Sequence, residues 1–165
     1  MSRLIAIVPF AFAIGSSVAL GEDLKLPPLQ KQPTPQAVID EHFDALNNCD
    51  WNRIMAQYPA DYQLNLPGGV IVKGREKAGE LFATFVKPHD QGGLCGIKFT
   101  PEQTFTVGET LNIQWKAEAD FLAEAYKGSD AYEAHDGLMA GMVSTFKGED
   151  LKVKEVATGS STRNK

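Results

Sequence analysis

No part of this chain concentrates positive charge. Its 16 Lys and Arg stand against 21 Asp and Glu, for a formal net charge of −5, and no stretch forms a basic stripe or alternates basic with aromatic residues. Proteins that bind nucleic acids or anionic membrane surfaces use such stripes to neutralise phosphates. We therefore expect no nucleic-acid partner and no stable attachment to an anionic membrane surface.

Motifs for metal binding and covalent catalysis are also missing. The chain has 2 cysteines and 3 histidines, but no CxxC motif and no histidine pair at the spacing of metal ligands. It has neither a GxSxG turn nor the surroundings of a catalytic cysteine. We expect no metal and no cofactor, and the sequence disfavours acyl transfer through a covalent intermediate.

The first 21 residues have the pattern of an export signal. Arg3 is the only charged residue before Glu22, residues 4–20 are apolar, and the ALG at 19–21 has the small-x-small form of a cleavage site. A membrane anchor is the competing interpretation, but the apolar run is short and is interrupted by a proline and a glycine. The pattern favours cleavage and a periplasmic or secreted protein.

Cys49 and Cys95 form a candidate disulfide. An even number of cysteines in an exported chain favours disulfide bonding, because that compartment is oxidising. Cys49 follows the first predicted helix and Cys95 lies in a Gly-rich loop, so both occupy the ends of elements. Two separate buried thiols are the alternative.

The length of 165 residues favours one domain. We place it at residues 34–157, between an extended leader (22–33) and a loose tail (158–165). The spacing of apolar side chains predicts its elements. The helices are predicted at 35–48, 51–58 and 74–87, and the strands at 62–66, 70–73, 97–107, 110–121, 130–135, 138–146 and 151–156.

Three of the strands carry further information. In the longest, Ile113 and Trp115 belong to an apolar face that alternates with polar residues. Pro101 interrupts residues 97–107, which predicts a bend, a bulge or a sheet edge. The Asp136-Gly137 turn joins the next two strands into a hairpin.

The order of the elements indicates an α+β fold. Helices and a short hairpin come first and a run of antiparallel strands follows, so the two kinds of structure are segregated along the chain. A curved, mostly antiparallel sheet buries one face only if the N-terminal helices pack inside its curve. We therefore expect a cone-shaped α+β barrel with a hollow centre.

These local patterns, taken in order, resemble the nuclear transport factor 2-like superfamily, in particular its SnoaL-like and ketosteroid-isomerase-like members. The resemblance covers residues 35–157. The segments that carry it are ALNNCDW at the end of the first helix, LNLPGG followed by GREKAGELFATF, the strand with Trp115, and YKGSDAYEAHDGLMAGMVSTF. The fold that this resemblance implies does not by itself determine an activity.

The resemblance also implies where a site would lie. In ketosteroid isomerases a tyrosine on the first helix and a protonated aspartic acid on a late strand hold the substrate oxygen, while a second aspartate moves the proton. At these three places this chain has His42, Asp130 and Leu66. Since leucine cannot move a proton, steroid isomerisation by that route is not expected.

His42 and Asp130 each have two interpretations. His42 lies on the apolar stripe of the first helix, where it is either a core histidine or a proton carrier that faces a ligand. Asp130 is either a strand-edge acid that caps backbone amides or a carboxyl inside the cone that faces His42. A His–Asp pair within hydrogen-bond reach would suit dehydration, hydration or enolisation.

Other residues are expected to line the cavity. Trp115 either forms a wall of it or packs in a dimer interface. The remaining candidates come from the first strand, the third helix and the last hairpin, and they are Tyr62, Leu66, Phe82, Tyr132 and Met142.

Two functions are compatible with these patterns. In the first, the chain is an exported SnoaL-like protein with a pocket for a small, apolar, oxygenated molecule. It acts there as a cofactor-independent lyase (dehydratase or cyclase) or isomerase, with His42 as acid and base and Asp130 as its partner. In the second, it is a non-catalytic module of the same fold that binds a hydrophobic ligand or serves in interaction. We expect a homodimer.

Overall fold

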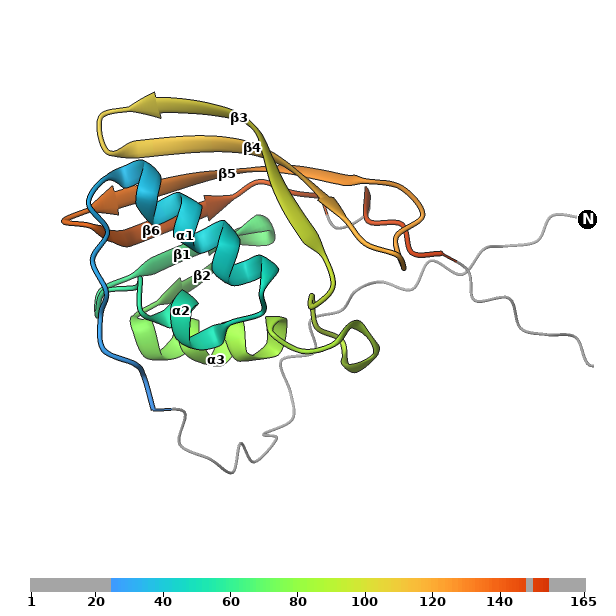
Figure 1. Ribbon diagram of the computed structural model, residues 1–165, viewed down its shortest axis with the longest axis horizontal. Helices are drawn as coiled ribbons and strands as arrows, with labels where there is room; N and C mark the ends of the chain where they lie inside the picture. Colours follow the sequence, from blue (N-terminus) through green and yellow to red (C-terminus); the bar gives the residue numbers. More distant parts are fainter. Residues whose placement is uncertain (1–24, 148–149, 155–165) are drawn as a thin grey trace, which may run out of the picture.

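A computed structural model describes residues 25–147 and 150–154 of the chain (Figure 1). The export signal (1–21), the first residues of the leader, the end of the last predicted strand and the tail (158–165) lie outside the described residues and stay predictions. Within the described ranges, no helix is long and apolar enough to span a membrane.

The α-helices of the described residues begin close to their predicted positions. The Thr34 hydroxyl accepts a hydrogen bond from the Ala37 amide at 3.1 Å, and the Asp50 carboxylate accepts one from the Arg53 amide at 3.0 Å. Each bond satisfies an amide that has no partner inside its helix. The second helix is shorter than predicted. The helices are α1 (Pro35–Asn47), α2 (Trp51–Met55) and α3 (Arg75–Phe85).

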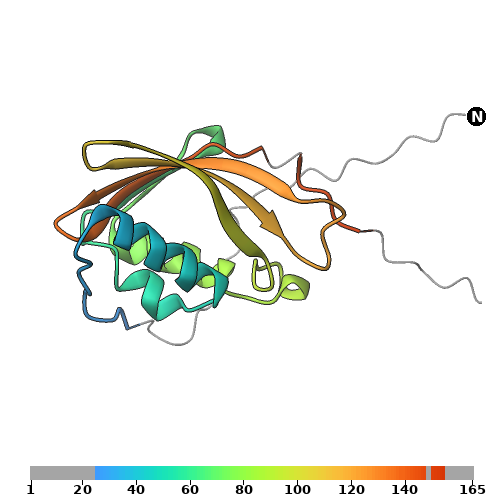
Figure 2. The same cartoon turned by 45° about the horizontal axis from the view of Figure 1, so that its top comes forward.

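A single sheet has the strand order β2-β1-β6-β5-β4-β3. Neighbouring strands are antiparallel, apart from the parallel pair of β1 and β6. The sheet is strongly curved without closing on itself, and the helices lie against its concave face (Figures 1 and 2). The predicted α+β cone is confirmed. The strands are β1 (Gln63–Leu66), β2 (Val70–Lys73), β3 (Lys98–Val107), β4 (Thr110–Glu118), β5 (Tyr126–His135) and β6 (Leu138–Ser144).

The interruption predicted at Pro101 is a bulge in the edge strand β3. The pairing of β3 with β4 shifts by one residue between Pro101 and Gln103. Because side chains alternate between the faces of a strand, this extra residue moves all later side chains to the opposite face. Phe105 therefore pairs with Asn112 on the outer face, where it is 54% exposed.

Several of the predicted strand boundaries are wrong: β5 begins at Tyr126 rather than at residue 130, and β6 ends at Ser144 rather than at residue 146. Strand β4 ends at Glu118 rather than at residue 121, because Glu118 is opposite the first residue of β3 and later residues have no partner strand on that side. Residues 150–154 do not form the predicted last strand of the sheet. They contribute an isolated antiparallel bridge between Val153 and Leu122.

Buried side chains occupy the space between the helices and the sheet, and neither hollow described below lies there. The hollow centre predicted from the sequence is therefore not found in the described residues. Alternate residues of β4 face this interior, as their spacing predicts. The interior is unusually aromatic near the middle of the cone. The largest side chains with almost no exposed surface there are Tyr58, Tyr62, Tyr132, Phe82, Ile39, Ile54, Met55 and Leu64.

The described part of the leader, residues 25–33, contains no helix or strand but is bonded to the domain. The Gln30 amide donates to the Ala56 carbonyl at 2.8 Å, and the Gln32 amide donates to the Gly137 carbonyl at 2.8 Å. These contacts connect the leader to α2 and to the turn between β5 and β6.

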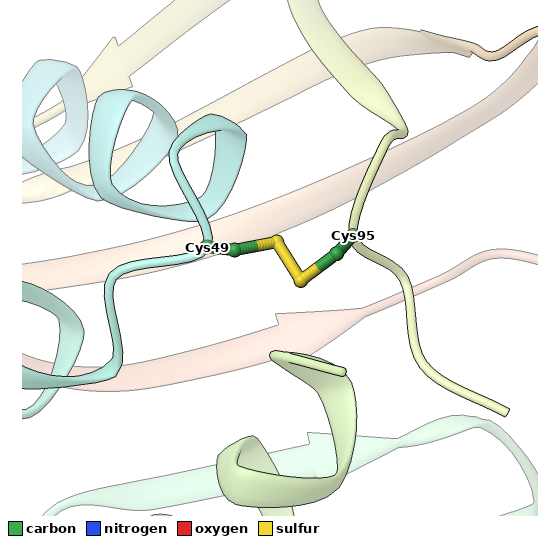
Figure 3. The surroundings of a disulfide bond; sticks show 2 residues. All are labelled: Cys49 and Cys95. Atoms are coloured by element: carbon green, nitrogen blue, oxygen red, sulfur yellow. A yellow bond between two sulfur atoms is a disulfide. The ribbon is translucent and has the colours of Figure 1, made fainter. Parts of the chain in front are cut away.

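A disulfide joins Cys49 and Cys95, as predicted (Figure 3). It links the end of α1 to the loop that precedes β3, and the two Cα atoms are 5.7 Å apart. Because the bridge spans 46 residues of sequence, it restricts the unfolded chain considerably.

Replacing both cysteines with alanine should lower the free energy of unfolding by about 4 kcal/mol, since a long loop of the unfolded chain would no longer be closed. Urea unfolding under non-oxidising conditions measures this change. Wild-type protein treated with a reductant should lose the same amount as the Cys49→Ala/Cys95→Ala variant. A loss below about 1 kcal/mol in both would contradict the entropic role of the bridge.

Candidate functional site

Asp130 lies on the concave side of β5, with 7% of its surface exposed. Its Oδ2 atom accepts hydrogen bonds from the Trp115 indole nitrogen at 2.7 Å and from the Tyr132 hydroxyl at 3.1 Å. Its Oδ1 atom has no hydrogen-bond partner. A buried oxygen atom without a hydrogen-bond partner is stabilised by any donor that reaches it.

Gly128 makes room for the indole that holds Asp130. Trp115 and Gly128 are opposite each other in the ladder between β4 and β5. A Cβ atom placed on Gly128 would overlap the Trp115 ring. The missing side chain on β5 therefore lets the indole lie across that strand and reach a carboxyl group two residues further along it.

Burial raises the pKa of Asp130 above its ordinary value of 3.8 because it disfavours the charged form. The hydroxyl of Ser144, the indole of Trp115, the hydroxyl of Tyr132 and the amide of Thr145 oppose this rise. Neither Ser144 nor Thr145 makes a well-formed hydrogen bond to the carboxyl. The balance favours an Asp130 that is protonated more readily than an exposed aspartate.

His42 lies in the middle of α1 and is 1% exposed. Its Nδ1 atom is 3.5 Å from the Tyr58 hydroxyl, which is a long hydrogen bond. Its ring is surrounded by aromatic rings, with Phe82 and Tyr132 in edge-on contact at centroid distances of 6.4 and 5.6 Å. Desolvation by burial lowers the pKa of His42 from 6.5 to about 3. The imidazole is therefore neutral at physiological pH.

Two tyrosines extend this buried polar group. Tyr58 and Tyr62 are stacked with ring centroids 3.9 Å apart and planes inclined by 2°. The Tyr62 hydroxyl is buried without a hydrogen-bond partner of acceptable geometry. Burial raises the pKa of Tyr62, and the nearby charge of Asp130 contributes to that rise. The interior of the cone thus contains a second polar atom that a ligand could satisfy.

His42 and Asp130 are both interior groups, but no hydrogen bond joins them. Tyr132 lies between them, since its ring contacts the imidazole and its hydroxyl donates to the carboxylate. The sequence predicted a hydrogen bond between them, directly or through a water, but the connection runs through a tyrosine of β5. Catalysis by a His–Asp pair stays a prediction.

Two hollows in the described residues lie away from this cluster. One, of about 550 Å³, is formed at the corner between β3 and β4 beside Cys95 and Phe121. The other, of about 320 Å³, lies on the outer face of the sheet over Gly141. Neither is lined by His42 or Asp130.

The predicted lining residues are distributed between these regions. Tyr62, Phe82 and Trp115 are buried in the interior around the polar cluster. Tyr132 and Met142 are buried too, although parts of both also border the hollow on the outer face. Leu66 is half-buried at the end of β1.

The sequence patterns did not identify Tyr58 as a neighbour of His42. We predicted Tyr58 as the last residue of the second helix, but α2 ends at Met55 and Tyr58 follows the turn after it. The one sequence signal for its contact with Tyr62 is that the two tyrosines are four residues apart. We expected Tyr62 in a strand and in the lining of the cavity, without a contact to Tyr58. Stacking of the two rings depends on a turn that the spacing of residues does not reveal.

The other two histidines lie outside the cluster. The ring of His89 is stacked on Phe121 with centroids 3.7 Å apart. His135 is exposed, and its Nδ1 atom is 2.8 Å from a carboxylate oxygen of Glu109. In the part of the chain that the structure describes, no three His, Cys, Asp or Glu side chains are grouped as metal ligands.

Comparison with known proteins gives one family match. The model of the SnoaL-like domain family matches residues 39–156. That range includes all of the polar cluster around His42 and Asp130. The comparison with curated proteins gave no match.

Many solved structures share this fold. A putative ketosteroid isomerase from Kribbella flavida has a TM-score of 0.57 at 18% identity, covering 79% of this chain and 87% of its own. RV0760c from Mycobacterium tuberculosis has a TM-score of 0.60 at 16% identity, covering 76% of this chain and 100% of its own. SalBIII is an epoxide hydrolase/cyclase-like enzyme with a role in pyran ring formation in the polyether salinomycin. It has a TM-score of 0.60 at 15% identity, covering 73% of this chain and 95% of its own. At these identities the likeness concerns the fold.

His42 should make the stability of the fold depend on pH. Because its pKa is lower in the folded state than in the unfolded state, stability is complete above the unfolded value and is lost as the pH falls. Between about pH 7 and pH 5 this loss is about 2 kcal/mol. Urea unfolding at the two pH values measures this drop in the free energy of unfolding. The drop should be smaller in the His42→Gln variant than in wild type, by about 2 kcal/mol. The variant His89→Gln serves as the control and should keep the wild-type loss.

Proposed function

Because this chain belongs to the SnoaL-like domain family, we propose that it binds a small, largely apolar, oxygenated molecule inside the cone and acts on it as a cofactor-independent lyase or isomerase. The protein acts after export, in the periplasm or outside the cell. The disulfide between Cys49 and Cys95 is compatible with an oxidising compartment.

The observation that carries this proposal is the pair of unsatisfied polar atoms in an aromatic interior. Asp130 Oδ1 and the Tyr62 hydroxyl are both buried without a hydrogen-bond partner. A ligand oxygen between them would form hydrogen bonds in a region of low dielectric constant, where such bonds are strong. The surrounding rings, among them Phe82 and Tyr132, would contact the apolar part of the molecule.

The directions in which burial shifts the pKa values of Asp130 (upward) and His42 (downward) suit a particular division of roles. A neutral Asp130 would donate a proton or a hydrogen bond from Oδ1 to a ligand oxygen, which stabilises negative charge that develops on it. A neutral His42 would accept a proton, directly or through Tyr58. Tyr132 connects the two groups. Together they could support loss of water or enolisation without a metal.

A non-catalytic ligand-binding module is the second candidate, and one residue favours it. Leu66 lies where the ketosteroid isomerases have the aspartate that moves the proton. The low pKa of His42 also makes its imidazole a weak base. If no other group replaces that aspartate, the cluster recognises an oxygenated molecule and releases it unchanged.

Ligand binding is tested with the mature protein in a thermal-shift screen of lipophilic ketones, phenols and hydroxy acids, with hits confirmed by native mass spectrometry. Tyr62→Phe and Asp130→Asn should each weaken binding of a hit about tenfold, because each removes or alters one of the two unsatisfied groups. Tyr62→Phe should leave the stability of the free protein unchanged or raise it. Asp120→Asn, in the connection after β4, is the matched control.

The same hits separate the two candidates. An isomerase or lyase should exchange a C–H proton of the bound ligand in heavy water or release water from it, both measured by NMR, and His42→Gln should slow this at least tenfold. Binding without turnover would support the non-catalytic module. Equal affinities in wild type, Tyr62→Phe and Asp130→Asn would remove the site altogether.

We also propose that the partner of this chain is a second copy, bound through the outer face of the sheet. Pairing across the strands aligns one row of outward side chains over the full width of the sheet, and three of its members are exposed apolar residues. Monomers seldom leave a broad apolar band open to water. The row is Ile71, Asn65, Val143, Ala131, Asn112 and Phe105.

The hollow of about 320 Å³ lies beside this row, over Gly141. An aromatic side chain such as Phe105 from the second copy could fill it, and the reciprocal contact would form by twofold symmetry.

Phe105→Glu should convert the dimer to a monomer, because a carboxylate would be buried against the apolar row. Sedimentation equilibrium of the mature protein measures the mass. Leu29→Glu changes an apolar residue of 43% exposure in the leader and should leave the dimer intact. A wild-type protein that is monomeric at all accessible concentrations would show that the face has another role.

A further inference from the structure

The hollow of about 550 Å³ between β3 and β4, which we call the corner hollow, is lined by one cysteine of the disulfide. Cys95 is half-buried and borders this space, whereas Cys49 is not among the residues that line it. The volume is within the range of roughly 300–1,000 Å³ that is usual for small-molecule sites. A molecule of the size of a tripeptide could therefore lie against Cys95 from the solvent side.

The walls of the corner hollow are held by contacts other than the disulfide. In the loop before β3, the Cys95 amide donates to the Lys87 carbonyl at 3.0 Å. Across the hollow, in the connection after β4, the ring of Phe121 is stacked on that of His89 with centroids 3.7 Å apart. Breaking the bond between the two sulfur atoms would leave both contacts in place.

A second connection lies beside the disulfide and joins the same two segments. The Asn47 side-chain amide donates to the Phe99 carbonyl at 2.9 Å, and its carbonyl oxygen accepts from the Phe99 amide at 2.7 Å. Asn47 ends α1 just before Cys49, and Phe99 lies in β3 shortly after Cys95 (Figure 3). Since α1 stays pinned to β3 by these bonds, two reduced cysteines would remain neighbours and could bridge again.

The corner hollow carries charges of both signs. Lys98 and Glu118 are opposite each other at the end of the ladder between β3 and β4, and Asp120 follows shortly after β4. The ammonium group attracts a carboxylate or a thiolate, and the two carboxylates attract an ammonium group. All three side chains belong to exposed residues, so salt weakens these attractions. The combination suits a small molecule with both amino and carboxyl groups.

We propose that Cys95 is a site of thiol–disulfide exchange, reached through the corner hollow by a small thiol that carries amino and carboxyl groups. The incoming thiolate attacks Sγ of Cys95, where a new S–S bond forms as the bond to Cys49 breaks. The electron pair of the broken bond goes to Cys49, which takes a proton from water. A second molecule of the thiol attacks the mixed disulfide, frees Cys95 and leaves the small thiol as its oxidised dimer.

Access determines which sulfur is attacked, because exchange requires the thiolate to reach one sulfur of the disulfide. In the test, glutathione is added to the oxidised mature protein without denaturant, and free thiols are blocked with iodoacetamide at successive times. Peptide mass spectrometry should find glutathione on Cys95 and the blocking group on Cys49 roughly fivefold more often than the reverse. Equal labelling of the two cysteines, or reduction only in denaturant, would overturn the proposal.

The entry route is tested by filling the hollow. Ala119 is part of its lining, so Ala119→Phe should slow reduction by glutathione about threefold, since the added ring takes up space beside Cys95. Ala123→Phe lies in the same connection but outside the lining, and it is the matched control that should keep the wild-type rate. Equal rates in the two variants overturn entry through the hollow. If Ala119→Phe does not fold, the position of glutathione in wild type decides.

Two further measurements use the wild-type protein. The reduced form should keep the near-ultraviolet circular dichroism of the oxidised form without denaturant, because the bonds between Asn47 and Phe99 remain. Loss of that signal on reduction would make the disulfide a structural cross-link only and overturn reversible exchange. Thioredoxin, a protein with two reactive thiols, is the comparison reagent. Reduction by thioredoxin while glutathione has no effect would overturn the assignment to a small thiol.

Discussion

The hydrogen bond between the Trp115 indole and the buried carboxyl of Asp130 is the contact on which the interior of this protein depends. A carboxyl group removed from water must be protonated or bonded to donors, and here one of its oxygen atoms takes both donors. The indole reaches that oxygen only because Gly128, opposite it on β5, has no side chain. Trp115 also contacts Tyr126 at the start of β5. One bond thus connects two neighbouring strands of the sheet with the polar cluster.

The electrostatics of the cluster follow from the same burial. Desolvation favours the neutral forms of both His42 and Asp130, so the two groups are better described as a base and an acid than as an ion pair. Tyr132 separates them and contacts both. Proton transfer between them would pass through a hydroxyl or a ligand. This arrangement is consistent with chemistry on an oxygenated molecule and inconsistent with a permanently charged site.

Solved structures of this fold include a putative ketosteroid isomerase and an epoxide hydrolase/cyclase-like enzyme, so the cone accommodates different reactions. The polar groups of this chain lie in its interior. It has an imidazole among aromatic rings, a stacked pair of tyrosines and an apolar Leu66 at the end of β1. The activity must be decided from those groups, because the backbone shape is shared.

Local spacing along the chain was enough to predict the elements whose formation depends on neighbouring residues. Thr34 and Asp50 mark helix starts, alternation along β4 assigns its buried face, and Pro101 marks the bulge, since each depends on residues close in the chain. The same spacing placed His42 on the buried face of α1, whereas only the family resemblance indicated that Asp130 faces the interior. The folded structure was needed to show that Tyr132 lies between them, that Tyr58 stacks on Tyr62, and that Val153 forms an isolated bridge with Leu122 instead of extending the sheet. These contacts join distant segments across turns and a curved sheet, and their distances depend on how the packed elements meet, which no local pattern encodes.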